Sequence, residues 1–103
     1  MTGLLPSDIE IICEVLKKYP KVKEALFFGS RAKGNHRPGS DIDIAVKGHG
    51  TEFLTAQISG ELNDETSLPY TFDVIALEAL DNSELKEHIF RVGLPFYKNP
   101  SNT

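Results

Sequence analysis

The sequence predicts an α/β (α+β) fold in which helices pack on one small mixed sheet. Apolar residues recur at helical spacing in three segments, and they alternate or run continuously in four shorter, strand-like segments. The order is helix, strand, strand, helix, strand, helix, strand, with no internal repeat or linker. A chain of 103 residues has room for one modest core. We therefore expect a single domain over residues 1–98 and a frayed tail at 99–103.

The first helix and the first strand have clear start and stop signals. A helix is predicted to begin at Ser7, because Glu10 follows three residues later and completes a capping box. Tyr19-Pro20 ends this helix. A strand is expected over residues 22–28, and the continuous apolar run at its end indicates that both of its faces are covered.

The middle of the chain predicts a strand, a helix and another strand. Residues 41–46 alternate isoleucine and valine with aspartate and alanine, which is strand periodicity. Thr51 is expected to cap a helix that extends to about Asn63. The side chains expected to face the core from this helix are those of Phe53, Leu54, Ile58 and Leu62. A third strand is expected over residues 70–77.

The last part of the chain predicts one more helix and a short strand. Ser83 is expected to cap a helix that runs to about Val92, and Gly93 stops it. Residues 94–97 are then expected to add a short edge strand. These two elements complete the predicted helix-and-sheet layer.

Composition excludes several classes of function. The net charge is −4, which is unlike a basic nucleic-acid binder, so we expect no direct contact with nucleic acid. Cys13 is the only cysteine, which excludes an internal disulfide and a cysteine-based zinc cluster. No apolar run approaches the length of a membrane span, and the N-terminus lacks a signal-peptide pattern. We expect a cytoplasmic protein that does not engage a membrane.

Three carboxylates carry the strongest indication of function. Asp41 and Asp43 share one face of the second strand, with Cβ atoms about 6–7 Å apart. Asp73 lies among apolar neighbours in the third strand, where an unpaired charge is costly. If the two strands pair, the carboxylates form a repulsive cluster that bound cations relieve. Such a cluster favours a magnesium site, because Mg²⁺ prefers hard oxygen ligands. Two ions held in this way can clamp the attacking and leaving oxygens of a phosphoryl group.

An alternative interpretation of Asp41 and Asp43 is structural. A bare Asp-x-Asp pattern is also typical of the exposed face of an edge strand, where it only increases solubility. Aspartate is depleted in strands, however, and here a second strand carries Asp73. It is this third carboxylate that favours the metal-binding interpretation.

A short turn precedes the aspartates. Gly29 allows a phosphate to approach the backbone closely, and a helical turn that begins at Ser30 would direct N–H groups at an anion. Arg31 and Lys33 can neutralise β- and γ-phosphate charge. Glycine-serine turns with surface cations are common. Only the position of this turn ahead of the aspartates indicates a nucleotide site.

These residues together resemble a known superfamily. Gly29-Ser30, ten intervening residues, Asp41-Ile42-Asp43 and the later Asp73 are similar to the pattern of the polymerase-β-like nucleotidyltransferases. The stretches at 29–34 and 40–46 resemble its minimal subgroup, the MNT domain. The resemblance covers roughly residues 7–98 and would make the whole domain a minimal nucleotidyltransferase with a polymerase-β palm-like fold.

The resemblance implies a reaction and a set of site residues. Such enzymes transfer a nucleoside monophosphate, usually AMP from ATP, to an acceptor hydroxyl and release pyrophosphate. Asp41 and Asp43 would carry two Mg²⁺ ions, and Asp73 would share one ion and help to activate the acceptor hydroxyl. The nucleotide-binding residues would be Gly29, Ser30, Arg31, Lys33 and Ser40.

The resemblance also implies a partner. MNT proteins are often paired with a small helical HEPN toxin and act as its antitoxin, in some cases by adenylylating a tyrosine of the toxin. Larger relatives carry an added helical domain that binds the acceptor, so we expect this chain to use a partner and to form a homo- or hetero-oligomer. Three hypotheses stay open: a protein adenylyltransferase, a non-catalytic antitoxin or nucleotide-binding module that neutralises its partner by contact, and an acidic domain without a nucleotide site.

Overall fold

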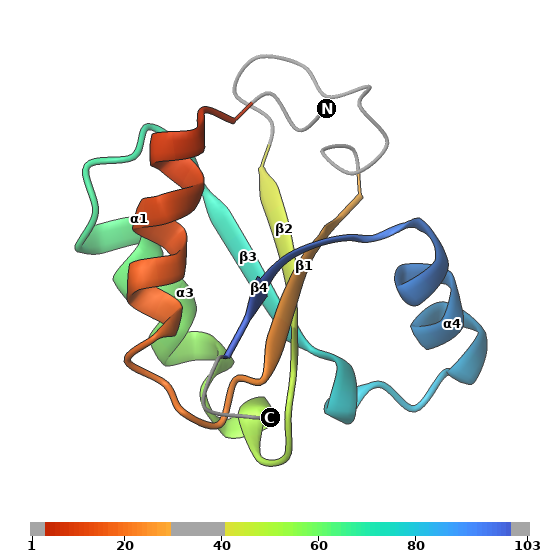
Figure 1. Ribbon diagram of the computed structural model, residues 1–103. Coiled ribbons are helices and arrows are strands. Elements are labelled where there is room, and N and C mark those ends of the chain that lie inside the picture. Colours follow the sequence, from red (N-terminus) through yellow and green to blue (C-terminus); the bar gives the residue numbers. More distant parts are fainter. Residues whose placement is uncertain (1–3, 30–40, 100–103) are drawn as a thin grey trace.

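The structure is a computed structural model that describes residues 4–29 and 41–99 (Figure 1). The described residues form one sheet from β1 (Glu24–Phe28), β2 (Ile42–Lys47), β3 (Phe72–Ala76) and β4 (Leu94–Lys98). Its spatial order is β3-β2-β1-β4. β1 is antiparallel to β2 and to β4, whereas β2 and β3 are parallel. The predicted mixed sheet is therefore confirmed.

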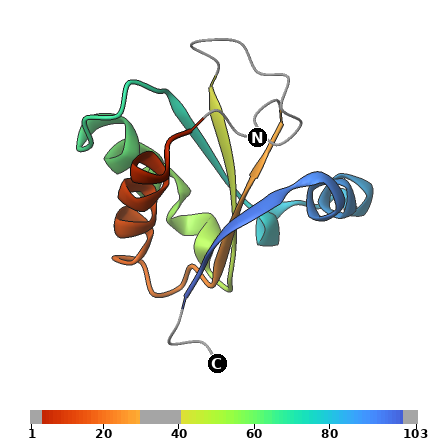
Figure 2. The ribbon, with the colours of Figure 1, turned by 45° about the horizontal axis from the view of Figure 1, so that its top comes forward.

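The helices lie on both sides of this sheet. α1 (Pro6–Leu16) and α3 (Thr55–Asp64) cover one face, and α4 (Ser83–Val92) lies on the other (Figure 2). Short 3₁₀ turns follow β2 and β3, namely η1 (Thr51–Phe53) and η2 (Leu77–Ala79). The parallel pair β2 and β3 is thus connected through α3, as a parallel pair requires.

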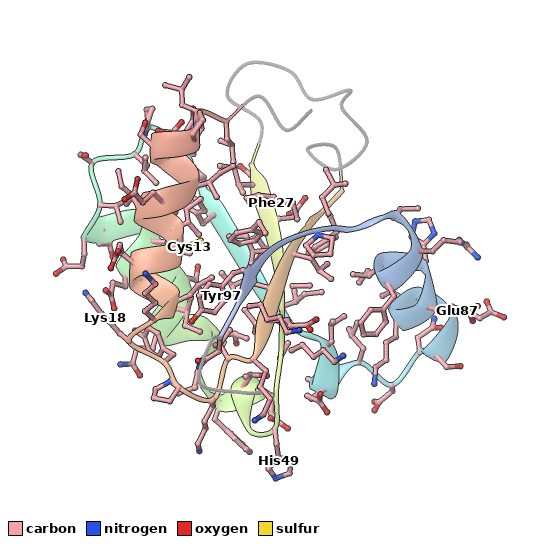
Figure 3. All side chains as sticks on the ribbon, viewed as in Figure 1. Cys13, Lys18, Phe27, His49, Glu87 and Tyr97 are labelled. Carbon is pink, nitrogen blue, oxygen red and sulfur yellow. The ribbon has the colours of Figure 1, made fainter. Side chains whose placement is uncertain are left out.

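The sheet separates two hydrophobic cores of unequal size, one on each face. The larger core lies under α1 and α3 and includes Phe27 and Tyr97 (Figure 3). The smaller core lies under α4 and is formed by Leu26, Ala45, Leu77 and Ile89. Neighbouring residues of β1 contribute to different cores, which confirms that this strand is covered on both faces. On β2, alternation sends Ile42, Ile44 and Val46 into the larger core and leaves Asp43 on the α4 side.

α1 begins earlier than predicted. Its first residue is Pro6, which suits that position because proline has no N–H to leave unpaired. The backbone N–H of Leu5 donates to the Asp8 carboxylate over 3.1 Å. The predicted capping box of Ser7 and Glu10 is therefore wrong, and Asp8 supplies the side chain that closes this end of the helix.

The segment after β2 also differs from the prediction. Thr51 does not cap a long helix. Its hydroxyl donates to the Gly48 carbonyl over 2.8 Å, and Thr51 is the first residue of the 3₁₀ turn η1. The tighter turn directs Phe53 outward, where it is 84% exposed. The prediction that Phe53 faces the core is wrong, whereas Ile58 and Leu62 of α3 are buried as expected.

The last helix has a different cap from the predicted one. Asn82 accepts hydrogen bonds from the N–H groups of Glu84 and Leu85, so Ser83 is the first residue inside the helix. Gly93 ends α4 as predicted. β4 follows as an edge strand beside β1, which also confirms the prediction for this segment.

Candidate functional site

Two of the predicted site carboxylates are neighbours in the sheet. Asp43 is the second residue of β2 and Asp73 the second residue of β3, and the parallel register pairs them directly. Paired residues of adjacent strands point to the same face, with strands about 4.8 Å apart. Both side chains therefore lie on the α4 face of the sheet. The strand pairing on which the predicted cluster depends is present.

Asp41 extends this pair into a line of negative charge. It lies just before β2, two residues from Asp43, and is exposed. Burial raises the pKa of the Asp43 carboxyl above its ordinary value, and the charges of Asp73 and then Asp41 raise it further. The three carboxylates are thus close enough to repel one another. Their roles in catalysis and metal binding remain predictions.

Gly29 brings the end of β1 against this cluster. Phe28 is the register partner of Asp43, and Gly29 follows it with φ +72°, in the left-handed region that favours glycine. A Cβ atom at position 29 would lie 3.4 Å from Asp43 Cγ and would overlap Asp43 Oδ2. Glycine is therefore required here both by the backbone and by the neighbouring carboxylate.

The other predicted nucleotide-binding residues lie outside the described residues. These residues are Ser30, Arg31, Lys33 and Ser40. Gly29 and Asp41, the described residues that flank them in the sequence, both lie close to Asp43. The roles of the four residues remain predictions.

The donor set at this site suits a hard divalent cation. Within residues 4–29 and 41–99, no three histidine, cysteine, aspartate or glutamate side chains already converge closely enough to hold one metal ion. The carboxylates of Asp41, Asp43 and Asp73 nevertheless supply the oxygen ligands that Mg²⁺ prefers. Burial, and then the charges of Asp73 and Asp41, raise the pKa of Asp43, and a bound cation would relieve the repulsion among the carboxylates. The chemistry of these donors therefore suits Mg²⁺, and metal binding at this site remains a prediction.

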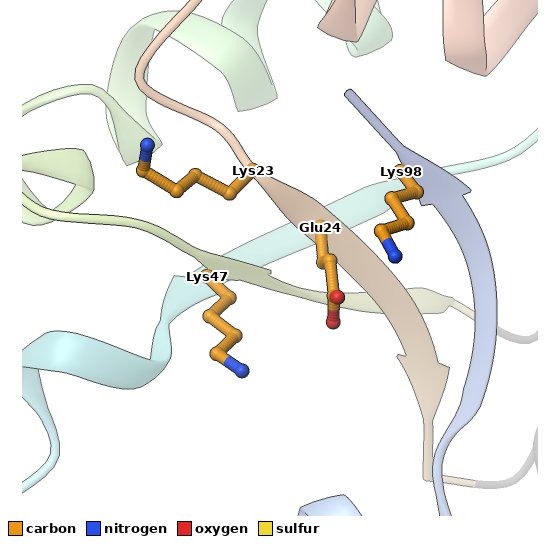
Figure 4. Close-up of a pocket in the computed structure, with 4 residues that line it drawn as sticks. All are labelled: Lys23, Glu24, Lys47 and Lys98. Carbon is orange, nitrogen blue, oxygen red and sulfur yellow. The ribbon is translucent and has the colours of Figure 1, made fainter. Parts of the chain in front are cut away.

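The far end of the same sheet face has a different charge pattern. Lys47 of β2 and Lys98 of β4 flank Glu24 of β1 as its register partners, and the three side chains extend from one side of the sheet (Figure 4). With Lys23, they line a cavity of about 210 Å³. Lys47 Nζ also lies 5.3 Å from the centre of the Phe90 ring. This end lies four residues, or roughly 13 Å, along β2 from Asp43.

The family of the chain follows from comparison with known proteins. A family model described as "Polymerase beta, Nucleotidyltransferase" matches residues 10–102. The chain belongs to this nucleotidyltransferase family. No match was found among curated protein sequences.

The solved structures with the same fold include chains of toxin–antitoxin complexes. A chain of a toxin–antitoxin crystal structure with AMP-PNP matches with a TM-score of 0.72 and 23% identity, over 95% of this chain and 77% of that chain. A chain of an MntA–HepT toxin–antitoxin structure matches with a TM-score of 0.70 and 20% identity, over 95% and 76%. A third match, with a TM-score of 0.68 and 20% identity over 93% and 74%, comes from the tri-AMPylated Shewanella oneidensis HEPN toxin in complex with MNT antitoxin.

These comparisons confirm the predicted fold class and family. At such identities the structural likeness establishes the fold of this nucleotidyltransferase, and the activity of the matched proteins is not carried over by it. No helix within the described ranges is both long and apolar enough to cross a membrane.

Proposed function

We propose that this nucleotidyltransferase transfers AMP from ATP to a hydroxyl of a partner protein and acts as the antitoxin of a HEPN/MNT pair in the cytoplasm. The observation that carries the proposal is the direct pairing of Asp43 with Asp73 beside Asp41 and Gly29. Membership of the family supports the reaction class. The AMP-PNP complex and the AMPylated toxin among structures of the same fold support the nucleotide and the partner.

The carboxylates would hold the reacting groups in place. Asp41 and Asp43 would bind two Mg²⁺ ions, with Asp73 as a ligand of one of them. Bound Mg²⁺ would neutralise phosphate charge and lower the pKa of the acceptor hydroxyl. The absence of a side chain at Gly29 makes room for the Asp43 carboxylate and would also let the triphosphate approach the backbone. The predicted binding residues Ser30, Arg31, Lys33 and Ser40 would complete its site.

The proposed transfer balances as a simple displacement. The acceptor hydroxyl oxygen forms a bond to the α-phosphorus of ATP, and the bond from the α-phosphorus to the bridging oxygen of the β-phosphate breaks. Pyrophosphate leaves with that electron pair. The hydroxyl proton passes first toward Asp73, whose carboxylate stands at the sheet edge and is exposed.

A labelling experiment tests this function. The protein would be incubated with α-³²P-labelled ATP, Mg²⁺ and the protein encoded beside it, in wild-type form and as Asp43→Asn. We expect label on the neighbouring protein with the wild type and none with the variant. No transfer by the wild type to that protein would contradict the proposal. Neutralisation of the partner in cells by both Asp41→Asn and Asp43→Asn would instead support an antitoxin that acts by contact.

A further inference from the structure

Asp73 lies on an edge strand, and no described residue holds its side chain by a hydrogen bond. β3 is the outermost strand on its side of the sheet, so only β2 pairs with it. The backbone N–H of Ile42 donates to the Thr71 carbonyl over 2.8 Å at the start of this pairing. Because neighbouring residues of a strand direct their backbone groups to opposite sides, Phe72 presents its N–H and carbonyl to the open edge.

Asn63 of α3 occupies this open edge. The Phe72 N–H donates to Asn63 Oδ1 over 2.8 Å, and Asn63 Nδ2 donates to the Phe72 carbonyl over 3.1 Å. One side-chain amide thus pairs with both edge groups of a single residue, as a neighbouring strand would. α3 runs alongside β3 on the α1 side of the sheet (Figure 1), and the two hydrogen bonds to Phe72 place Asn63 at this edge.

A second residue of the same helix supports this contact. Ser59 lies one turn before Asn63, and its hydroxyl donates to the same Phe72 carbonyl over 3.2 Å. Asn63 Nδ2 also donates a hydrogen bond to Ser59 Oγ over 3.2 Å. The Phe72 side chain is only 3% exposed and packs in the larger core. Phe72 is therefore fixed from the core side and from the edge.

We infer that Asn63 is a positioning residue that holds β3 at Phe72 and thereby keeps Asp73 beside Asp43. This inference rests on the proposed function, because it gives Asp73 its role in transfer. Its physical basis is that Asp73 depends on its backbone for its position, and the preceding residue is where that backbone is anchored. Since Asn63 does not contact the reacting groups, it acts only through Asp73.

Two variants test the contact with α3 otherwise intact. Asn63→Ala removes both hydrogen bonds. Asn63→Asp keeps the size of the side chain but places a carboxylate oxygen, in place of the Nδ2 donor, against the Phe72 carbonyl. Gln57→Ala, an exposed position on the same helix, is the matched control. All three would be compared with the wild type in the full-length protein.

The first readout is independent of enzymatic activity. Amide hydrogen exchange measured by NMR should become at least about tenfold faster at Asp73 in both Asn63 variants, because the end of β3 loosens. The Gln57→Ala variant should exchange at the wild-type rate. Unchanged exchange at Asp73 in both Asn63 variants would overturn the inference, whatever the outcome of the labelling experiment.

The second readout separates positioning from general stability. We expect kcat for transfer to fall about 10- to 100-fold in both Asn63 variants, as when a group that orients a metal ligand is removed, with KM for ATP within about twofold of the wild type. A wild-type kcat in the Asn63 variants would overturn the inference. If the wild type itself transfers nothing, the proposed function fails, and hydrogen exchange alone decides whether Asn63 holds β3.

Discussion

The two ends of the α4 face of the sheet use charge in opposite ways. At one end, Lys47, Glu24 and Lys98 alternate in sign across three strands, so that each charge has an opposite neighbour. At the other end, Asp43 and Asp73 are paired with like charge, and burial together with both neighbouring carboxylates raises the pKa of Asp43. Cross-strand pairs of opposite charge stabilise a sheet, and like pairs destabilise it. This difference is expected under the proposed function, in which the aspartate end binds a ligand at a cost in stability.

The largest expected effect is on transfer. Asp43→Asn should lower the rate of nucleotidyl transfer by roughly 10²–10³-fold, because a ligand is lost from the proposed Mg²⁺ ions that would stabilise charge on the reacting phosphoryl group. Lys47→Gln, at the other end of the same strand, should leave the rate within about twofold of the wild type. Rates would be measured with labelled ATP and the neighbouring protein. A comparable loss in both variants would contradict the difference between the two ends.

The second effect concerns the glycine at the aspartate end. Gly29→Ala should destabilise the fold by roughly 1–2 kcal/mol from its left-handed backbone alone, and more from overlap with Asp43. Gly60→Ala is the control, because a Cβ there meets nothing within 4 Å and the position lies inside α3. This control should stabilise the protein by about 0.5–1 kcal/mol.

Chemical denaturation of Gly29→Ala and Gly60→Ala measures both effects. The free energy of unfolding should change with opposite signs in the two variants. Equal effects at positions 29 and 60 would mean that the close approach to Asp43 has no energetic consequence.

The third effect is on stability without metal. In the absence of divalent cations, Asp43→Asn should raise the free energy of unfolding by about 0.2–1 kcal/mol, because a like-charge pair is removed. Glu24→Gln should lower it by a similar or smaller amount, since Lys47 and Lys98 lose the charge between them. Thermal melts in a chelating buffer measure both variants. Destabilisation by Asp43→Asn would argue against repulsion at this site.

Added Mg²⁺ should reverse the order of stability of the wild type and Asp43→Asn. Metal that binds only the folded protein raises its melting temperature, so wild type should gain stability with Mg²⁺ and a non-hydrolysable ATP analogue. Asp43→Asn should gain less or nothing. An equal rise in both proteins would place the binding site elsewhere.

The smallest expected effect concerns a pair of opposite charges that lies outside both ends of the α4 face. Glu61 of α3 accepts hydrogen bonds from Lys18 Nζ and, over 2.8 Å, from the Tyr19 hydroxyl. These two hydrogen bonds, that of Lys18 first, lower the pKa of Glu61 below its ordinary value. Because the pKa is lower in the folded state, the stabilisation is present above the unfolded value of about 4.3 and is lost as the pH falls through the folded value.

Glu61→Gln measures this contribution. The wild type should be slightly more stable than the variant at pH 7, and the difference should shrink toward pH 3. The effect should be small, because the Lys18 side chain is 66% exposed (Figure 3). Melting temperatures of both proteins at the two pH values provide the test. A difference that grows toward pH 3 would contradict the sign of the shift.

The sequence predicts the sheet well because strand signals here are periodic. The apolar run before Gly29 and the alternation around Asp43 identify β1 and β2, and spacing alone places Asp41 and Asp43 on one face. The sequence places Asp43 beside Asp73 only if their two strands pair, and no local sequence pattern determines which strands pair. The structure shows that they do, because β2 and β3 are parallel neighbours with Asp43 opposite Asp73.

The missed features depend on local geometry that leaves no periodic signal. Phe53 faces outward because a 3₁₀ turn, and not an α-helix, follows Gly50. The caps of α1 and α4 are Leu5 and Asn82, which lie two residues and one residue before the predicted Ser7 and Ser83, a usual uncertainty of element boundaries. The sequence predicts Asn63 only as the end of a helix, because hydrogen bonds from a side chain to the backbone nine residues away leave no pattern in the sequence.

A titration with Mn²⁺ in place of Mg²⁺ tests the central claim most directly. Paramagnetic Mn²⁺, added at substoichiometric amounts with a non-hydrolysable ATP analogue, broadens NMR signals of nearby amides. We predict that the signals of Gly29, Asp43 and Asp73 are lost first, and that those of Glu24, Lys47 and Lys98 persist to higher Mn²⁺. Loss at the lysine end first, or uniform loss across the sheet, would contradict a cation site formed by the three aspartates.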